Sequence, residues 1–351
     1  MSKLIFVTGA SGFLASHVIY QLLQDGYRVR ATARGKKVAA LKELYSAHPA
    51  LEIVEVPDIA HSQFAEALAD VDAVIHTATP LPARVDPETM LHTAIEGSLN
   101  VLRQAEKAGV RKFVVTSSTA AINGDPTVVG VSFRTHHWNP AKKEEINADT
   151  DPVEAYSAAK ALSERAVWDW AAAHPHVDVT TINPTYIYGP AAPLTLRLAP
   201  GDFVGLSTNL FIYNLITPPG QHLPGAGSID VRDAARAHIG ALGNDATAAP
   251  GARKRAILAS PHGLVERYLF ELYRKERPAV AGRMIAGEGV VPVFDRYDLD
   301  FAEIESFTGM KKSDYHTMEQ TFLDALDSLL VIEKDWKEQG FVVKDVPLMQ
   351  A

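Results

Sequence analysis

The sequence predicts an α/β fold: a doubly wound parallel sheet with helices on both faces, accompanied by a smaller, mostly helical lobe. Two observations predict this fold class. In the first half of the 351-residue chain, runs of β-branched residues alternate with helical segments, as in strand–helix–strand units. After Pro190 the alternation weakens and Pro and Gly recur. We therefore expect a sheet domain at 1–190, rejoined by segments from about 226–260, and a lobe made of 191–225 and 261–351.

The expected strands share a high content of β-branched residues and lie between turn signals. They are 3–9, 27–33, 51–57, 72–78, 112–118 and 177–184. Helical segments alternate with them at 12–25, 36–47, 62–69, 88–108 and 154–173. A helix at 231–243 and a strand at 254–259 then bring the chain back to the sheet. Two amphipathic helices, 261–278 and 316–336, either cap the lobe or meet a partner, and we favour the cap.

Composition and charge exclude several classes of protein. With 47% hydrophobic and 22% charged residues the chain can bury a large core, and its net charge of −8 argues against general binding to nucleic acid. It contains no Cys, which excludes disulfides, thiolate metal sites and cysteine nucleophiles and favours a reducing compartment. We expect a cytoplasmic protein, either a monomer or a homodimer, without a nucleic-acid partner.

Membrane attachment and metal binding are not expected either. The apolar N-terminal stretch is broken by Gly9, Gly12 and His17, which suits neither a signal peptide nor a membrane span. His136 and His137 are adjacent and have no carboxylate at useful spacing, so a solvated loop is a better interpretation than a metal site.

A glycine turn follows the first expected strand. The sequence VTGASGFLASH has Gly9, Gly12 and the small Ala15 at three-residue intervals, where the strand meets a helix. Glycines there allow a tight turn and bring backbone N–H groups close to a pyrophosphate at the positive end of the helix. An ordinary glycine turn is the alternative, but the position within a strand–helix–strand unit favours a Rossmann-type dinucleotide site.

Basic residues end the second expected strand. No acidic residue, which would bind the ribose hydroxyls of NAD, occurs between Gly26 and Lys42. Arg34, with Lys36 or Lys37, can instead hold a 2′-phosphate, and the planar guanidinium of Arg34 is the better match. The alternative is a solvated basic turn. The sequence therefore favours NADPH/NADP as the cofactor.

A Tyr and a Lys lie four residues apart in the helical stretch EAYSAAKALSE. Tyr156 and Lys160 therefore share one face of a helix. The fifth expected strand ends with Ser117 and Ser118, and ligands of such sheets bind outside the carboxyl ends of the strands. Strand alternation sends only one of these serines toward the site, and we favour Ser118. A surface Tyr with a Lys one turn later is the alternative interpretation.

Seven motifs occur in the order and spacing of one known family, over about residues 3–260. They are TGASGFLASH (8–17), Asp58-Ile59, HTATP (76–80), TSSTAAIN (116–123), YSAAK (156–160), NPTYIYGP (183–190) and DVRDAARAH (230–238). The chain thereby resembles the extended short-chain dehydrogenases/reductases. It is most similar to their dihydroflavonol-4-reductase-like group, which includes microbial NADPH-dependent aldehyde and ketone reductases.

The resemblance implies a cofactor site and a catalytic set. Asp58 would lie at the adenine, Thr77 to Pro80 along the cofactor, and Pro184 and Thr185 near the nicotinamide. With the glycine turn and the basic residues, the expected cofactor-binding residues are Gly9, Ser11, Gly12, Phe13, Leu14, Arg34, Lys37, Asp58, Ile59, Thr77, Ala78, Thr79, Pro184 and Thr185. The implied catalytic residues are Ser118, Tyr156 and Lys160.

These three residue types fit carbonyl reduction. Hydride addition puts negative charge on the carbonyl oxygen, which Tyr156 would protonate and Ser118 would hold by a hydrogen bond. The ammonium of Lys160 would favour the phenolate, lowering the pKa of Tyr156 from about 10, and would also hold the cofactor ribose.

The substrate is less clearly specified. Ser-Ala-Ala between Tyr156 and Lys160 argues against the acyl-CoA-reducing branch, and Thr119-Ala120-Ala121 after Ser118 provide no base of the kind sugar-nucleotide dehydratases use. Asn123 is either a substrate contact or a turn residue. The apolar segment 203–220, beginning with Phe203, is either a pocket wall for aryl or alkyl carbonyl compounds, or else core or a subunit interface.

We therefore expect an NADPH-dependent carbonyl reductase whose small-molecule substrate is a hydrophobic or aryl aldehyde or ketone. A 3β-hydroxysteroid or sugar-nucleotide dehydrogenase/epimerase of the same superfamily is the second hypothesis. A regulator that senses NADP without chemistry is the third, although such proteins typically lose the Tyr/Lys pair that this chain keeps.

Overall fold

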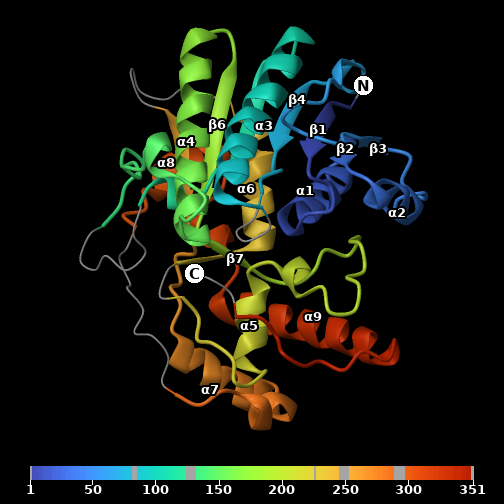
Figure 1. The fold of residues 1–351 in the computed structure, drawn as a ribbon, viewed down its shortest axis with the longest axis vertical. Coiled ribbons are helices and arrows are strands. Elements are labelled where there is room, and N and C mark those ends of the chain that lie inside the picture. The colour runs from blue at the N-terminus through green and yellow to red at the C-terminus, as the bar shows by residue number, and fades with distance from the viewer. Residues whose placement is uncertain are drawn as a thin grey trace.

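A seven-stranded parallel sheet forms the centre of the larger part of the molecule (Figure 1). The computed structural model describes residues 2–80, 85–123, 132–224, 227–244, 253–287 and 297–348. In chain order the strands are β1 (Leu4–Thr8), β2 (Arg28–Ala33), β3 (Leu51–Glu55), β4 (Ala73–His76), β5 (Lys112–Thr116), β6 (Asp178–Pro184) and β9 (Lys254–Leu258). Their spatial order is β3-β2-β1-β4-β5-β6-β9, with every pair parallel. The doubly wound, Rossmann-type fold is thus confirmed, and its switch point lies between β1 and β4.

Helices cover both faces of this sheet. On one face, α1 (Phe13–Gln24), α2 (Lys36–Leu44) and α6 (Val231–Gly243) contribute to a core with β1 and β2. On the other face, α3 (Pro87–Lys107) and α4 (Pro152–Ala173) lie side by side and bury Leu102 and Val167. The expected helix at 62–69 is wrong: only the 3₁₀ turn Ala65–Leu68 forms, because a single turn has too few backbone hydrogen bonds to persist as an α-helix.

A second hydrophobic cluster, which we call the lobe core, is formed by buried side chains within 188–223, 264–285 and 318–336. It is built from α5 (Asn209–Leu215), α7 (Glu266–Glu276) and α9 (Met318–Glu338), which lie together at one end of the molecule (Figure 1). In the sequence, two short strands that pair in parallel, β7 (Tyr186–Tyr188) and β8 (Ser228–Asp230), flank the first of these ranges. These helices bury their apolar faces against one another, as their amphipathic patterns require.

One C-terminal segment belongs with the sheet rather than with the lobe. The helix α8 (Phe301–Thr308) packs on α6, and Ile304, Met310 and Tyr315 enter the same core as β1 and β2. The sequence assigned these residues to the lobe because the strand pattern had ended. Residues 226 and 245–252 of the expected returning segment lie outside the described residues. Across the described ranges, no helix is long and apolar enough to cross a bilayer.

Candidate active site

Helix α4 carries Tyr156 and Lys160 in its first turns. It begins after Asp151, whose Oδ1 accepts hydrogen bonds from the backbone N–H groups of Val153 (2.8 Å) and Glu154 (3.2 Å). This N-cap fixes the start of the helix, so the two functional side chains project from well-defined turns. A run of small alanines lets the helix approach the sheet closely.

Lys160 is held at the carboxyl ends of two neighbouring strands. Its side chain is only 6% exposed, and its Nζ donates to the carbonyl oxygen of Thr116 (2.9 Å) and to Oγ1 of Thr79 (3.3 Å). Burial lowers the pKa of Lys160 to about 8, and the negative charge of Glu164 acts in the opposite direction. The ammonium is therefore easier to deprotonate than that of an exposed lysine.

Tyr156 is half-buried, and its phenol lies near the side chain of Ser118. Burial raises the pKa of Tyr156, and the neighbouring Ser118 hydroxyl offsets this only in part. The lowering of this pKa that we expected from Lys160 is not observed, because the ammonium donates to Thr116 and Thr79 instead. At neutral pH the phenol is protonated, which is the form that can donate a proton.

The two adjacent serines point in different directions. Ser117 is buried and its Oγ donates to Oε2 of Glu164 at 2.6 Å. Ser118 has extended backbone and its hydroxyl lies on the side of Tyr156, where its Oγ also accepts from the N–H of Ala120 (3.1 Å). Ser118, Tyr156 and Lys160 are thus brought to one edge of the sheet, as the sequence predicted they would be if they form a site.

The glycine turn has the geometry of an anion site. Gly9 has a φ of +78°, and a Cβ at this position would lie 3.2 Å from the Cα of Ala78, so only glycine fits without strain. Gly12 is the N-cap of α1 and has no side chain with which to cap the first N–H groups of that helix. These N–H groups are therefore free to bind a negatively charged group.

Thr77 and Ala78 are held against the turn by Thr8. The N–H groups of both residues donate to Oγ1 of Thr8 at 3.1 Å, and Oγ1 of Thr77 donates to the carbonyl of Thr8 at 2.5 Å. His76, which the sequence analysis missed, continues this network through Nδ1 to Oγ1 of Thr8 (2.8 Å) and through Nε2 to Oγ of Ser98 (3.2 Å). Burial, and secondarily the charge of Lys160, lowers the pKa of His76 to about 3, so the ring is neutral.

The basic residues after β2 lie at the surface near the turn. Arg34 is exposed and makes no ion pair with any described residue, and Nζ of Lys37 donates to Oγ of Ser11 at 3.3 Å. Asp58 is also exposed and is paired with His61 at 2.9 Å, which lowers the pKa of the carboxyl group. Ile59 is half-buried beneath α3.

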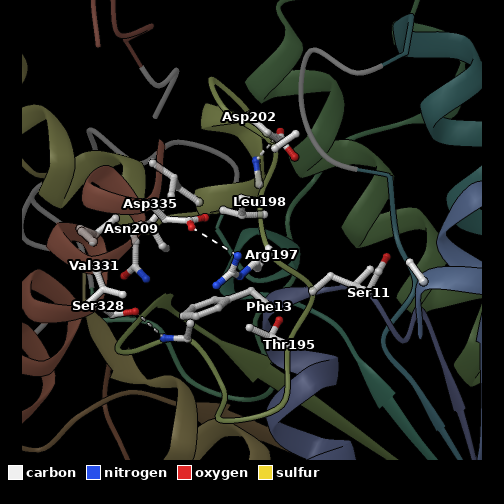
Figure 2. A pocket seen from close by; sticks show the side chains of 18 of the residues that line it. Ser11, Phe13, Thr195, Arg197, Leu198, Asp202, Asn209, Ser328, Val331 and Asp335 are labelled. Atoms are coloured by element: carbon white, nitrogen blue, oxygen red, sulfur yellow. Dashed lines mark hydrogen bonds and ion pairs between the residues drawn. The ribbon is translucent and has the colours of Figure 1, made fainter. Parts of the chain in front are cut away.

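A cavity of about 700 Å³ adjoins the turn (Figure 2). Ser11, Phe13 and Lys37 form part of one wall, and α9 with the segment 195–209 forms the other. Figure 2 shows Arg197 directed toward Asp335, with Nη1 and Oδ1 3.5 Å apart. Three of the expected cofactor-binding residues therefore face one space. Ser118, Tyr156 and Lys160 do not line it.

Several expected site residues have structural partners instead. Thr185 is buried and bonds the carbonyl of Leu258 through both its N–H (3.0 Å) and its Oγ1 (3.3 Å). The carbonyl of Pro184 accepts from Oγ1 of Thr119 (3.4 Å). Asn123 is buried at the end of the turn that follows Ser118. These residues lie near the strand ends, but their described bonds are to the protein itself.

Phe203 is not brought to the catalytic group. Its ring packs edge-to-face on Trp336 with centroids 5.4 Å apart and stacks on Tyr213 at 6.3 Å, within the lobe core. Most of the apolar segment that it begins is therefore core, although Gly205, Leu206 and Asn209 also line the cavity. His136 is exposed, as expected for a solvated loop, and the described residues contain no cluster of three or more metal-ligand side chains.

Comparison with known proteins gives consistent results. The model of the NAD dependent epimerase/dehydratase family matches residues 5–252. An uncharacterized oxidoreductase of Schizosaccharomyces pombe is 31% identical over 95% of this chain and 99% of its own length. An NADPH-dependent methylglyoxal reductase of Saccharomyces cerevisiae is 31% identical over 67% of this chain and 72% of its own length. The crystal structure of a yeast methylglyoxal/isovaleraldehyde reductase with NADPH has a TM-score of 0.77 and 25% identity, covering 94% of this chain and 99% of that one.

Proposed function

Since the chain belongs to the NAD dependent epimerase/dehydratase family, among the extended short-chain dehydrogenases/reductases, we propose that it is an NADPH-dependent oxidoreductase that reduces an aldehyde or ketone to an alcohol. The approach of Ser118 and the half-buried Tyr156 to one another, beside the buried Lys160 at the same edge of the sheet, is the observation on which this function depends most. Related yeast proteins named as NADPH-dependent methylglyoxal reductases support it, since methylglyoxal is a carbonyl compound.

NADPH fits the residues around the glycine turn. The positive φ of Gly9 and the uncapped first turn of α1 suit a pyrophosphate, and the exposed guanidinium of Arg34 with Lys37 suits a 2′-phosphate. Asp58 would lie at the adenine, residues 77–79 would lie along the cofactor, and Lys160 would hold the ribose near the nicotinamide. When bound, NADPH supplies the hydride.

The chain itself would manage the proton and the charge. Tyr156, protonated because burial raises its pKa, donates its proton to the carbonyl oxygen. Ser118 donates a hydrogen bond to the same oxygen and stabilises the charge that develops on it. The ammonium of Lys160, which donates to Thr116 and Thr79 rather than to the phenol, would hold the cofactor ribose in place for the reaction.

For the substrate we propose a small hydrophobic carbonyl compound, aliphatic or aryl. The substrates named for the related yeast reductase, methylglyoxal and isovaleraldehyde, are small carbonyl compounds. Asn123, buried just beyond Ser118, is the proposed polar contact. Phe203 packs on Trp336 in the lobe core, and this packing explains its burial. We therefore propose no role for Phe203 in substrate binding.

The test compares wild type with Tyr156→Phe by NADPH consumption on a panel of aliphatic aldehydes, aryl ketones and α-keto compounds, with NADH in parallel. We expect kcat of Tyr156→Phe to fall about 100-fold or more. Tyr268→Phe is the matched control, because Tyr268 is exposed and, among the described residues, its hydroxyl bonds Glu319 on the surface. Unchanged turnover in Tyr156→Phe would contradict the mechanism, and epimerisation without net consumption of cofactor would favour the epimerase hypothesis.

A further inference from the structure

A buried ion pair lies directly behind Ser118. The side chains of Glu164, on α4, and Arg255, on β9, are each about 2% exposed. Nε of Arg255 lies 2.6 Å from Oε1 of Glu164, and Nη2 lies 3.3 Å from Oε2. Removing two charges from water is costly, so a pair of this kind persists only where further hydrogen bonds complete it.

Those further bonds converge on the carboxylate of Glu164. Oε2 accepts from Ser117 Oγ (2.6 Å) and Asn183 Nδ2 (2.7 Å), and Oε1 accepts from Thr181 Oγ1 (3.0 Å) and Trp168 Nε1 (3.3 Å). Burial raises the pKa of Glu164, but Arg255 and these donors outweigh burial and lower it. The carboxylate is therefore ionised and fully hydrogen-bonded.

The same bonds fix the backbone around Ser118. Ser117, which precedes it, is anchored by its side chain to Glu164. Asn183 donates both to Glu164 and, at 3.1 Å, to the carbonyl oxygen of Ser118. Arg255 Nη2 donates to the carbonyl of Ala121 at 3.2 Å, three residues later. The backbone that carries the Ser118 hydroxyl is thus held before, at and after this residue.

Arg255 also orders the segment that passes beside this turn. Its Nη1 donates to the carbonyl oxygens of Thr135 (2.7 Å) and His137, and its guanidinium lies 3.7 Å from the ring centroid of Trp138. Asn139 then bonds the carbonyl of Ala121 through its N–H at 3.0 Å. One guanidinium therefore connects α4, the turn after Ser118 and the 135–138 segment.

Glu164 has a second connection to the site. It lies one helical turn after Lys160, and its charge raises the pKa of Lys160 against the effect of burial. The carboxylate thus acts on Lys160 through its charge and on the backbone of Ser118 through Ser117 and Asn183, without occupying the site itself.

We infer that Glu164 is a positioning residue of the proposed reduction: through Ser117 and Asn183 its carboxylate fixes the backbone that directs the Ser118 hydroxyl at Tyr156, while Arg255 holds that carboxylate in place. The inference rests on the proposed function, since it assumes that Ser118 and Tyr156 act on the substrate. It adds that their geometry is set by a buried charge outside the site.

The first experiment measures kcat and KM of Glu164→Gln. This substitution keeps the shape of the side chain, but the amide nitrogen cannot accept the hydrogen bonds that a carboxylate oxygen accepts. We expect kcat to fall about tenfold or more, with the KM for NADPH within twofold of wild type. Asp178→Asn is the matched control. Asp178 bridges Lys112 and Lys254, both at 2.7 Å, across the same strands β5, β6 and β9 but at their amino ends. We expect this control to lose stability and retain kcat.

A second readout does not require turnover. Because the chain contains no cysteine, Ser118→Cys introduces a single thiol whose alkylation rate by iodoacetamide reports its orientation. We expect Glu164→Gln to change this rate at least fivefold and Asp178→Asn to leave it unchanged. If Glu164→Gln does not fold, Ser117→Ala replaces it, because that change removes one link and no charge.

The outcomes are separable. The inference would be overturned by equal alkylation rates of Ser118→Cys alone, combined with Glu164→Gln and combined with Asp178→Asn. A kcat of Glu164→Gln equal to that of wild type would also overturn it. If the wild type reduces no carbonyl compound, the proposed function fails, whereas the alkylation rates still decide whether Glu164 positions residue 118.

Discussion

Ser117 and Ser118 are neighbours in sequence but have different surroundings, because successive side chains at a strand end point to opposite sides. Ser117 donates inward to a buried carboxylate, whereas the side chain of Ser118 lies near the phenol of Tyr156 at the edge of the sheet. The direction in which each serine side chain points therefore decides whether its hydroxyl stabilises the fold or is available to a substrate.

This difference predicts a separation of effects. Ser118→Ala should lower kcat about 100-fold, since it removes the group that holds the developing oxyanion, and should leave the melting temperature nearly unchanged. Ser117→Ala should destabilise the fold by about 1–3 kcal/mol, because it leaves a buried acceptor of Glu164 with one donor fewer, and should affect kcat less. Steady-state kinetics with thermal unfolding of both variants tests this, and the reverse assignment would mean that Ser117 is the catalytic hydroxyl.

The lowered pKa of Lys160 predicts a pH dependence. The groups that face it are His76 on β4, His238 on α6 and Glu164 on α4; both imidazoles have pKa values lowered by burial, to about 3 and about 4, so they are neutral above pH 6. Lys160 carries its charge below about pH 8 and loses it above, so kcat should fall as the pH rises through about 8. In Glu164→Gln this decline should move to lower pH, because the charge that raises the pKa is gone. A profile that is flat to pH 10 would show that the ammonium is not required.

Arg34 is predicted to select the cofactor. In Arg34→Ala the KM for NADPH should rise about tenfold or more, because a charge-assisted contact with the 2′-phosphate is lost, and the KM for NADH should not change. Lys42→Ala, an exposed basic residue in the last turn of α2, is the control and should alter neither value. Equal increases for the two cofactors would refute a 2′-phosphate contact.

At the scale of elements, local patterns were sufficient for most of the sheet. The β-branched runs predicted all seven strands, although 112–118 was too long: β5 ends at Thr116, and the two serines already belong to the following turn. The helix pattern placed Tyr156 and Lys160 on α4 because their spacing is local. The role of Glu164 could not be predicted, because its partner Arg255 comes 91 residues later and only the sheet brings them together.

The N-cap of α4 predicts a link between helix stability and activity. Asp151→Ala should destabilise the protein by about 0.5–2 kcal/mol and lower kcat, because the frayed turn lies next to Tyr156, and Asp151→Ser should restore both. Asp86 caps α3 in the same way, through the N–H of Thr89 at 2.9 Å, and Asp86→Ala should cost similar stability. Thermal unfolding and kcat of the three variants decide the matter; an equal loss of kcat in both alanine variants would rule out the specific link.

At the scale of the whole molecule, α6 connects the C-terminal segment with the site. On its sheet side, His238 donates from Nδ1 to the carbonyl of Ala234 (2.7 Å), so its neutral ring accepts at Nε2 from Oγ1 of Thr116 (2.8 Å). The carbonyl oxygen of Thr116 in turn accepts a hydrogen bond from Nζ of Lys160. On its other side, α6 packs on α8. Sequence patterns could not predict this arrangement, since α7, a helix of the lobe, lies between α6 and α8 in the chain.

Gly240 makes that packing possible and gives the sharpest test of it. A Cβ at this position would lie 1.8 Å from the carbonyl oxygen of Thr308, so Gly240→Ala must displace α8 from α6, and we expect a loss of about 3 kcal/mol or more in the free energy of unfolding. Gly243 is on the same helix, and a Cβ there meets no described atom within 4 Å, so Gly243→Ala should be neutral or stabilising by up to about 1 kcal/mol. Denaturant unfolding of both variants measures the difference. Because α6 also holds Thr116 through His238, Gly240→Ala should lower kcat even under conditions where the protein stays folded. If the two variants have equal stability, α8 does not rest on α6 in solution.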